Sequence, residues 1–159
     1  MKICLTLILL FAAYNSSANA ARPQSSDLVG RWKIDITFEN ESRRSFNFDA
    51  DNTGRGALVM EEVRNNWIEP SRPSQVKWMM GADKRVTFSA PVDFPIGNVG
   101  RETGILLFKG AFKSGTKITG EIELYPVDQD PMDTKSTPIK TGTFEATRVR
   151  ANSSSTSKR

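Results

Sequence analysis

An alternation of apolar and polar residues constrains the fold of this chain more than any other feature. It is cleanest in residues 28–39, where apolar side chains occupy every second position from Trp32 to Phe38. A period of two places such side chains on one face of a β-strand. Residues 28–150 contain no sustained three- and four-residue apolar spacing of the kind that marks an amphipathic helix. The pattern therefore predicts an all-β domain.

The alternating segments predict about eight strands, mostly joined by short turns. We expect these strands at residues 28–39, 43–49, 56–63, 74–80, 85–90, 103–112, 116–124 and 140–149. No helix is available for a parallel crossover, so sequential antiparallel pairing is the economical topology. Closing the sheet into an up-and-down barrel removes its edges. We therefore expect a barrel, with a β-sandwich as the alternative. The long loops are expected at residues 64–73, 91–102 and 125–139.

The first twenty residues have the pattern of a secretory signal peptide. Lys2 precedes an apolar run from Ile3 to Ala13, and the segment closes on small residues up to Ala20. This run of about eleven residues is shorter than the roughly 20 that cross a bilayer. We expect cleavage after Ala20 and a secreted or periplasmic protein without a membrane anchor. Residues 21–27 then form a flexible lead-in, residues 28–149 the barrel domain, and residues 150–159 a disordered, Ser-rich tail.

The composition removes several classes of chemistry. The chain has no histidine, and its single cysteine, Cys4, lies inside the predicted signal peptide. Ser-His and Cys-His catalysis and thiolate metal sites are therefore excluded for the mature protein. Asp128, Asp130 and Asp133 alternate in one loop, but the glycine and bidentate glutamate of a calcium loop are missing. We expect no catalysis, no metal site and no cofactor.

Charge gives little indication of an anionic partner. The chain has 22 basic and 18 acidic residues and a formal net charge of +4. The basic residues form only short clusters, such as Arg43-Arg44 and Lys84-Arg85, which are interspersed with acidic residues. Nucleic-acid binding proteins concentrate positive charge on one face. We therefore expect no nucleic-acid partner.

The entry to the first strand, Leu28-Val29-Gly30-Arg31-Trp32, resembles the opening of lipocalin-like proteins and of the wider calycin group. The resemblance covers residues 28–149 as a pattern of strands, and its specific motifs are few. It implies an up-and-down barrel with Trp32 plugging one end. It also implies that Arg148, from the last strand, packs over that indole as the barrel-closing partner.

Strand parity indicates which side chains line the barrel. An eight-stranded barrel either fills its interior with side chains or holds one small ligand. Gly56, Gly120 and Ala146 fall on the inward parity and would leave space there. The candidate cavity residues are Trp32, Ile34, Phe38, Phe46, Phe48, Met60, Trp78, Phe88, Leu107, Ile122 and Phe144.

Two functions are consistent with these residues. The first is a secreted, non-catalytic, lipocalin-like barrel that binds a small apolar or amphipathic molecule. The second is a protein-binding module, an inhibitor or envelope-associated protein, that grips its partner with the three long loops on a filled barrel. Trp67, expected inside a connection, is the candidate contact residue for that second function. A real cavity would favour the first, and a filled barrel with apolar loop tips the second.

Overall fold

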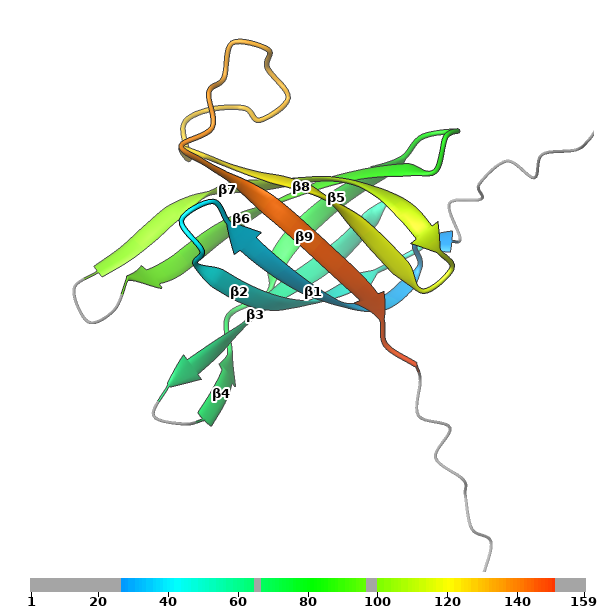
Figure 1. The fold of residues 1–159 in the computed structure, drawn as a ribbon, viewed down its shortest axis with the longest axis horizontal. Helices are drawn as coiled ribbons and strands as arrows, with labels where there is room; N and C mark the ends of the chain where they lie inside the picture. Colours follow the sequence, from blue (N-terminus) through cyan, green and yellow to red (C-terminus); the bar gives the residue numbers. More distant parts are fainter. Residues whose placement is uncertain (1–26, 65–66, 97–99, 151–159) are drawn as a thin grey trace, which may run out of the picture.

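An antiparallel sheet that closes on itself forms the body of the protein (Figure 1). The computed structural model describes residues 27–64, 67–96 and 100–150. Within them the strands are β1 (Gly30–Phe38), β2 (Arg43–Ala50), β3 (Arg55–Arg64), β4 (Trp67–Pro70), β5 (Ser74–Met80), β6 (Arg85–Ile96), β7 (Gly100–Ser114), β8 (Lys117–Tyr125) and β9 (Lys140–Arg148).

The strand order confirms the predicted barrel and shows that the sandwich alternative was wrong. Neighbouring strands follow the order β2-β1-β9-β8-β7-β6-β5-β3, and β2 pairs with β3 to close the ring. All of these pairings are antiparallel. The first and last strands lie side by side, with Trp32 opposite Arg148 and Phe38 opposite Gly142. β4 is an additional strand that pairs only with the end of β3.

Two of the predicted loops contain regular structure. Residues 64–73 include β4, which forms a hairpin with β3, so Trp67 lies in a strand rather than in an irregular connection. Most of residues 91–102 extends β6 and β7 into a long hairpin. Pro91 and Pro95 are tolerated there because this part of β6 pairs with β7 alone, since the pairing with β5 stops at Ser89. The predicted loop at 125–139 is confirmed beyond Tyr125.

The connections divide the barrel into two unlike ends. Short turns at residues 51–54, 81–84 and 115–116 lie at the end where β1 begins and β9 finishes, which we call the closed end. The opposite end, which we call the mouth, carries the β3–β4 hairpin, the β6–β7 hairpin and the long connection at 126–139. These three features stand away from the barrel in Figure 1.

Candidate functional site

Aromatic rings fill the middle of the barrel. The Phe88 ring from β6 stacks on Phe48 from β2, with centroids 4.8 Å apart, although β3 and β5 separate these two strands in the ring. The other face of Phe88 stacks on Phe108, with centroids 4.3 Å apart, and Phe144 packs edge-on against Phe108 at 5.3 Å. Phe46 also crosses from β2 to meet Phe108. Because rings from opposite walls touch, side chains occupy the barrel axis at this level.

The space expected at small residues is occupied by these rings. A Cβ added at Gly56 would lie 2.7 Å from the Phe48 ring and closer still to the Asp49 carbonyl oxygen. A Cβ at Gly110 would lie 2.6 Å from the Phe144 ring. At Gly120 an added Cβ would meet the backbone of β7, not an open cavity. These positions let the aromatic rings and strands approach closely, so they do not hollow the barrel.

A tryptophan and an arginine seal the closed end. The indole nitrogen of Trp32, which is fully buried, donates a hydrogen bond to the Leu28 carbonyl at 2.8 Å. The Arg148 guanidinium lies over the indole, 4.4 Å from its centroid, as the resemblance implied. Its nitrogens donate to the carbonyls of Val29 at 2.8 Å, of Gly115 at 3.1 Å and of Asp27.

Gly30 makes this closure possible. Its φ of 121° is a conformation that residues with a side chain rarely adopt, and an added Cβ would lie 3.1 Å from a terminal nitrogen of Arg148. The backbone conformation at position 30, two residues before Trp32, therefore favours glycine.

The structure buries all of the cavity candidates, but it places Leu107 on the wrong face. The inward-facing core contains Trp32, Ile34, Phe38, Phe46, Phe48, Met60, Trp78, Phe88, Ile122 and Phe144. In β7, Leu106 and Phe108 belong to that core, so Leu107 between them faces outward. It is nevertheless only 1% exposed. Burial on both faces of β7 made the parity of this segment ambiguous.

Leu107 shares the outer face with a small polar cluster. The Lys109 ammonium lies 2.7 Å from the Glu123 carboxylate, and the Tyr125 hydroxyl donates to the same carboxylate oxygen at 2.6 Å. Burial, and then the hydrogen bond to the Glu123 carboxylate, raise the pKa of Tyr125 to about 12. Burial would raise the pKa of Glu123, but the hydrogen bonds from Lys109 and Tyr125 together outweigh it and hold that pKa below its usual value.

The mouth carries charged side chains in inward-facing positions. Phe38 and Phe94, from opposite walls, meet edge-on at 5.9 Å and close the top of the apolar interior. Above them Arg44 lies 5.7 Å from the centre of the Phe94 ring, and Lys140 lies 5.9 Å from that of Phe38. The Lys140 ammonium pairs with the Glu102 carboxylate at 2.5 Å. We call Phe38, Phe94, Arg44, Lys140 and Glu102 the mouth cluster.

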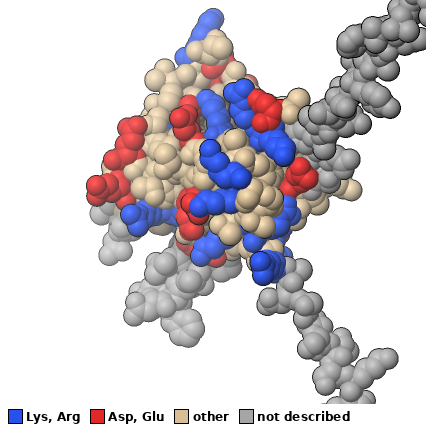
Figure 2. All heavy atoms as spheres, turned by 45° about the vertical axis from the view of Figure 1, so that its right-hand side comes forward, with Lys and Arg blue, Asp and Glu red and all other residues tan. Residues whose placement is uncertain are grey.

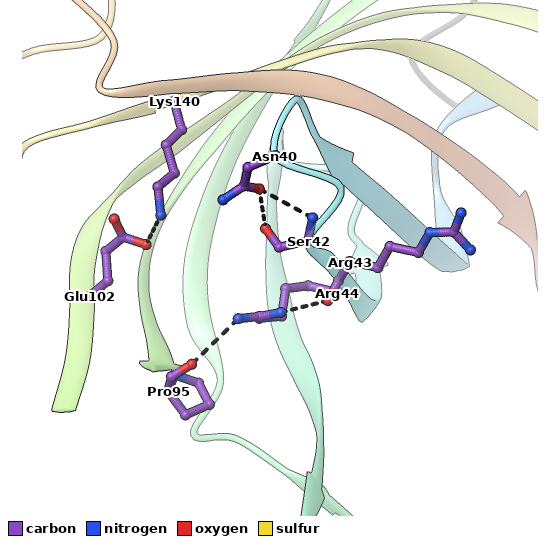
Figure 3. Close-up of polar contacts among 7 residues, drawn as sticks. All are labelled: Asn40, Ser42, Arg43, Arg44, Pro95, Glu102 and Lys140. Carbon is purple, nitrogen blue, oxygen red and sulfur yellow. Dashed lines mark hydrogen bonds and ion pairs between the residues drawn. The ribbon is translucent and has the colours of Figure 1, made fainter. Parts of the chain in front are cut away.

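Figure 3 shows how the mouth cluster is arranged. The Arg44 guanidinium reaches across toward β6 and donates to the Pro95 carbonyl at 3.4 Å, and it also donates to the carbonyl of Arg43 at 2.7 Å. The side chain of Arg43 points the other way. In the adjoining turn, the Asn40 side chain accepts hydrogen bonds from the amide and hydroxyl of Ser42 at 3.1 and 2.7 Å.

Sequence reasoning missed the charged residues of the mouth cluster, although the signal was present. Arg44 lies two positions before Phe46, Glu102 two before Gly104, and Lys140 four before Phe144. Each therefore continues the inward parity of its strand by a step or two. Extending the alternation past its last apolar residue would have placed all three at the end of the barrel.

Arg44 differs from the basic residues of the outer wall in its partners. Arg31 pairs with Asp49 at 2.9 Å, and Lys117 pairs with Glu145 at 2.9 Å, both on the outside. Figure 2 shows basic and acidic side chains interspersed over one face of the molecule. Among the described residues, no carboxylate lies within ion-pair distance of Arg44, whose partners are two carbonyl oxygens and a ring. Arg44 is also half-buried, so solvent screens its charge less.

Exposed apolar side chains also gather at this end. Ile96 ends β6, and Val127, Met132 and Ile139 lie in the connection between β8 and β9. Each of them is between 47% and 63% exposed. Ile139 directly precedes Lys140 and is held in place by a hydrogen bond from its amide to the Leu124 carbonyl at 2.7 Å. The mouth therefore combines positive charge with an apolar rim.

The alternating aspartates of this connection serve its backbone. Asp130 accepts a hydrogen bond from the amide of Met132 at 2.9 Å, and Asp133 accepts one from the amide of Lys135 at 3.0 Å. Across the described residues, acidic side chains form no group of three or more that could hold a metal ion. The described part of the chain also contains no helix long and apolar enough to cross a bilayer.

Comparisons with known proteins assign no family to the chain. No protein-family model and no curated protein matches the chain. Among solved structures, the redesigned β-barrel mFAP1 bound to DFHBI has a TM-score of 0.46 and 10% identity, over 79% of this chain and 98% of that one. EF1p2_mFAP2b bound to DFHBI has a TM-score of 0.45 and 12% identity, over 80% of this chain and 97% of that one. The closed antiparallel barrel itself is established by the strand pairing of this chain.

Proposed function

We propose that this chain is a secreted or periplasmic, non-catalytic barrel that binds a small amphipathic molecule at its mouth. The observation that carries the proposal is the layering of the mouth, where inward-facing Arg44, Lys140 and Glu102 lie directly above the Phe38 and Phe94 rings. An amphipathic molecule fits such a site, because its polar part can bind the charged side chains and its apolar part can pack against apolar surface at the mouth.

The packing of the interior favours the mouth over a deep cavity. The Phe48, Phe88 and Phe108 rings already occupy the barrel axis, so a ligand there would have to displace stacked rings. At the mouth, Ile96 and Ile139 are about half exposed and offer apolar surface without such displacement. Covering the exposed half of such an isoleucine side chain contributes roughly 1 kcal/mol.

The proposal that the protein is secreted or periplasmic rests on the sequence of residues 1–20, which lie outside the described residues. The proposal that it lacks catalytic activity rests on the absence of histidine from the whole chain and of cysteine beyond Cys4.

Two measurements test small-molecule binding. Native mass spectrometry of the protein from its own source, before and after solvent extraction, should show a removable adduct of a few hundred daltons, on the order of the size of pocket ligands. N-phenyl-1-naphthylamine, a neutral apolar dye, should bind saturably at one site. Ile96→Glu should weaken that binding, whereas Met79→Glu, at an even more exposed residue of β5, should not. Equal effects of the two variants would contradict binding at the mouth.

A second candidate function is supported by the connection at 126–139. Val127 and Met132 are 63% and 58% exposed there. Together with the filled interior, they fit the module that grips a protein partner with its loops. A partner captured by the wild-type chain should then be lost with Val127→Asp combined with Met132→Asp, and retained with Met79→Asp. Retention by the double variant would exclude this surface.

A further inference from the structure

The strongest unexplained feature of the molecule is the Arg44 guanidinium. It faces inward, is half-buried, and lies over Phe94 with two carbonyl oxygens as its hydrogen-bond acceptors. Removing a cation from water is unfavourable unless a counter-charge or full hydrogen bonding compensates. The contact with Pro95 is long, at 3.4 Å, so the compensation at Arg44 is incomplete.

The second cation of the mouth has its charge balanced. Lys140 pairs with Glu102 at 2.5 Å, and Glu102 lies opposite Phe94 in the β6–β7 pairing. Among the side chains that the structure describes, two cations and one carboxylate therefore surround the rings of the mouth, and the excess positive charge belongs to Arg44. Of these side chains, Glu102 is the carboxylate that an incoming anion would have to face.

We propose that Arg44 is the recognition residue for the anionic head group of an amphipathic ligand, which carries a carboxylate or sulfonate. The proposal rests on the function proposed above and names its ligand class. A guanidinium presents planar, paired N–H donors that match both oxygens of such a group. The low local dielectric over Phe94 strengthens this contact relative to an exposed arginine. Lys140 contributes a second positive charge when the head group approaches.

The apolar part of the ligand lies along the rim. Ile96 follows Phe94 by two positions on β6, and Ile139 directly precedes Lys140. Both are about half exposed and lie within two residues of a member of the mouth cluster along the chain, so we expect the apolar part of a ligand anchored at Arg44 to cover one of them. The ligand is a free, monomeric amphipath, because the Arg44 charge faces into the barrel rather than out onto a flat surface.

A matched pair of dyes tests the head group separately from the apolar part. The probe 1-anilinonaphthalene-8-sulfonate carries the skeleton of N-phenyl-1-naphthylamine with a sulfonate added. Arg44→Met keeps the length of the side chain and removes its charge. It should weaken sulfonate-dye binding about tenfold, the loss expected for one hydrogen bond to a charged group. Binding of the neutral dye should weaken much less than binding of the sulfonate dye.

Arg43→Met is the control, because the exposed Arg43 side chain points away from the mouth cluster. It should leave the affinity for both dyes unchanged. Equal weakening of sulfonate-dye binding by the two variants would overturn the assignment, since it would reflect net charge alone. If neither dye binds the wild-type chain, the proposed function itself fails. If both dyes bind equally and ignore Arg44, only the head-group assignment fails.

Glu102→Gln gives a test with the opposite sign. It removes the carboxylate that faces Lys140, so sulfonate-dye binding should become several-fold tighter, while neutral-dye binding should change much less. Unchanged or weaker sulfonate-dye binding would count against the proposal. Flotation with phosphatidylglycerol vesicles distinguishes a lipid surface from a free amphipath. We expect no co-flotation, and co-flotation abolished by Arg44→Met would replace the free amphipath with a membrane head group.

Discussion

Both ends of the barrel place a cation over an aromatic ring, but the cation at the closed end lies closer to its ring and makes more hydrogen bonds than the cation at the mouth. At the closed end Arg148 lies 4.4 Å from the Trp32 centroid and donates to three backbone carbonyls. At the mouth Arg44 lies 5.7 Å from the Phe94 centroid, and its contact across the barrel is a single long hydrogen bond. The hydrogen-bond partners of the cation, more than the cation–aromatic contact itself, distinguish a structural closure from a candidate binding site.

The largest expected effect is at the closed end. Arg148→Ala should lower the free energy of unfolding by about 3 kcal/mol, because it removes the cation–π contact and the hydrogen bonds to backbone carbonyls. Urea denaturation followed by circular dichroism measures this change. Arg150→Ala, two residues further along and exposed, is the matched control and should change stability by less than about 0.5 kcal/mol. Equal losses would remove the distinction between the two ends.

A smaller effect is expected from the glycine that permits this closure. Gly30→Ala should cost about 1 to 2 kcal/mol, because Gly30 has a φ of 121° and its added methyl group would crowd the Arg148 guanidinium. Gly115→Ala, at a turn position with open space around it, is the control. The same denaturation measurement checks both variants, and a neutral Gly30→Ala would show that the closure tolerates rearrangement.

Substitution of the arginine at the mouth should affect the free energy of unfolding less than substitution of Arg148. Arg44→Met should change the free energy of unfolding by under about 1 kcal/mol, since its contacts are longer and less complete than those of Arg148. Denaturation of this variant beside Arg148→Ala places the two ends on one scale. A loss as large as that of Arg148→Ala would show that Arg44 has the same structural role as Arg148.

The outer wall offers a third case, with no effect expected near neutral pH. The pKa of Tyr125 is raised to about 12, above the value near 10 of an unfolded chain. The folded state therefore holds its phenolic proton more tightly, so this stabilisation is complete below about pH 10 and lost as pH rises toward 12. Glu123→Gln removes the negative charge of the acceptor and weakens this hydrogen bond, so it should lower the midpoint of phenolate absorbance while burial keeps it above 10.

The matched control for this titration is Glu121→Gln, at an exposed carboxylate of the same strand and parity. In a chain without residues 1–20, Tyr125 is the only tyrosine, so the absorbance reports one group. A midpoint that Glu123→Gln leaves unchanged would contradict the hydrogen bond between Glu123 and Tyr125.

The fold was largely predictable because a two-residue period carries it. The alternation from Trp32 to Phe38 identified β1, and the same logic located every strand of the closed ring. It failed where both faces are apolar, because Leu106, Leu107 and Phe108 are all buried and parity alone cannot orient them. The extended β6–β7 hairpin was missed because Pro91 and Pro95 suggested a loop, whereas one-sided pairing accommodates them.

The candidate site was predicted less well, for a related reason. The apolar alternation identifies interior residues, and these form the filled middle of the barrel. The mouth cluster depends on Arg44, Lys140 and Glu102, which continue the inward parity of their strands but are charged, so a pattern of apolar residues does not include them. Their proximity comes from three strands distant in sequence, and only the closed ring brings them together.

The first and last strands of the barrel bring the two ends of the described chain to the same end of the barrel. β1 begins and β9 finishes at the closed end, where the amide of Val149 donates to the Arg31 carbonyl at 2.9 Å. A fusion partner or surface linkage joined directly at residue 27 or residue 150 is therefore attached at the closed end, and the mouth faces away from it. Immobilising the protein through either end should leave ligand access unobstructed, and a new linker between residues 27 and 150 would need to span only a short distance.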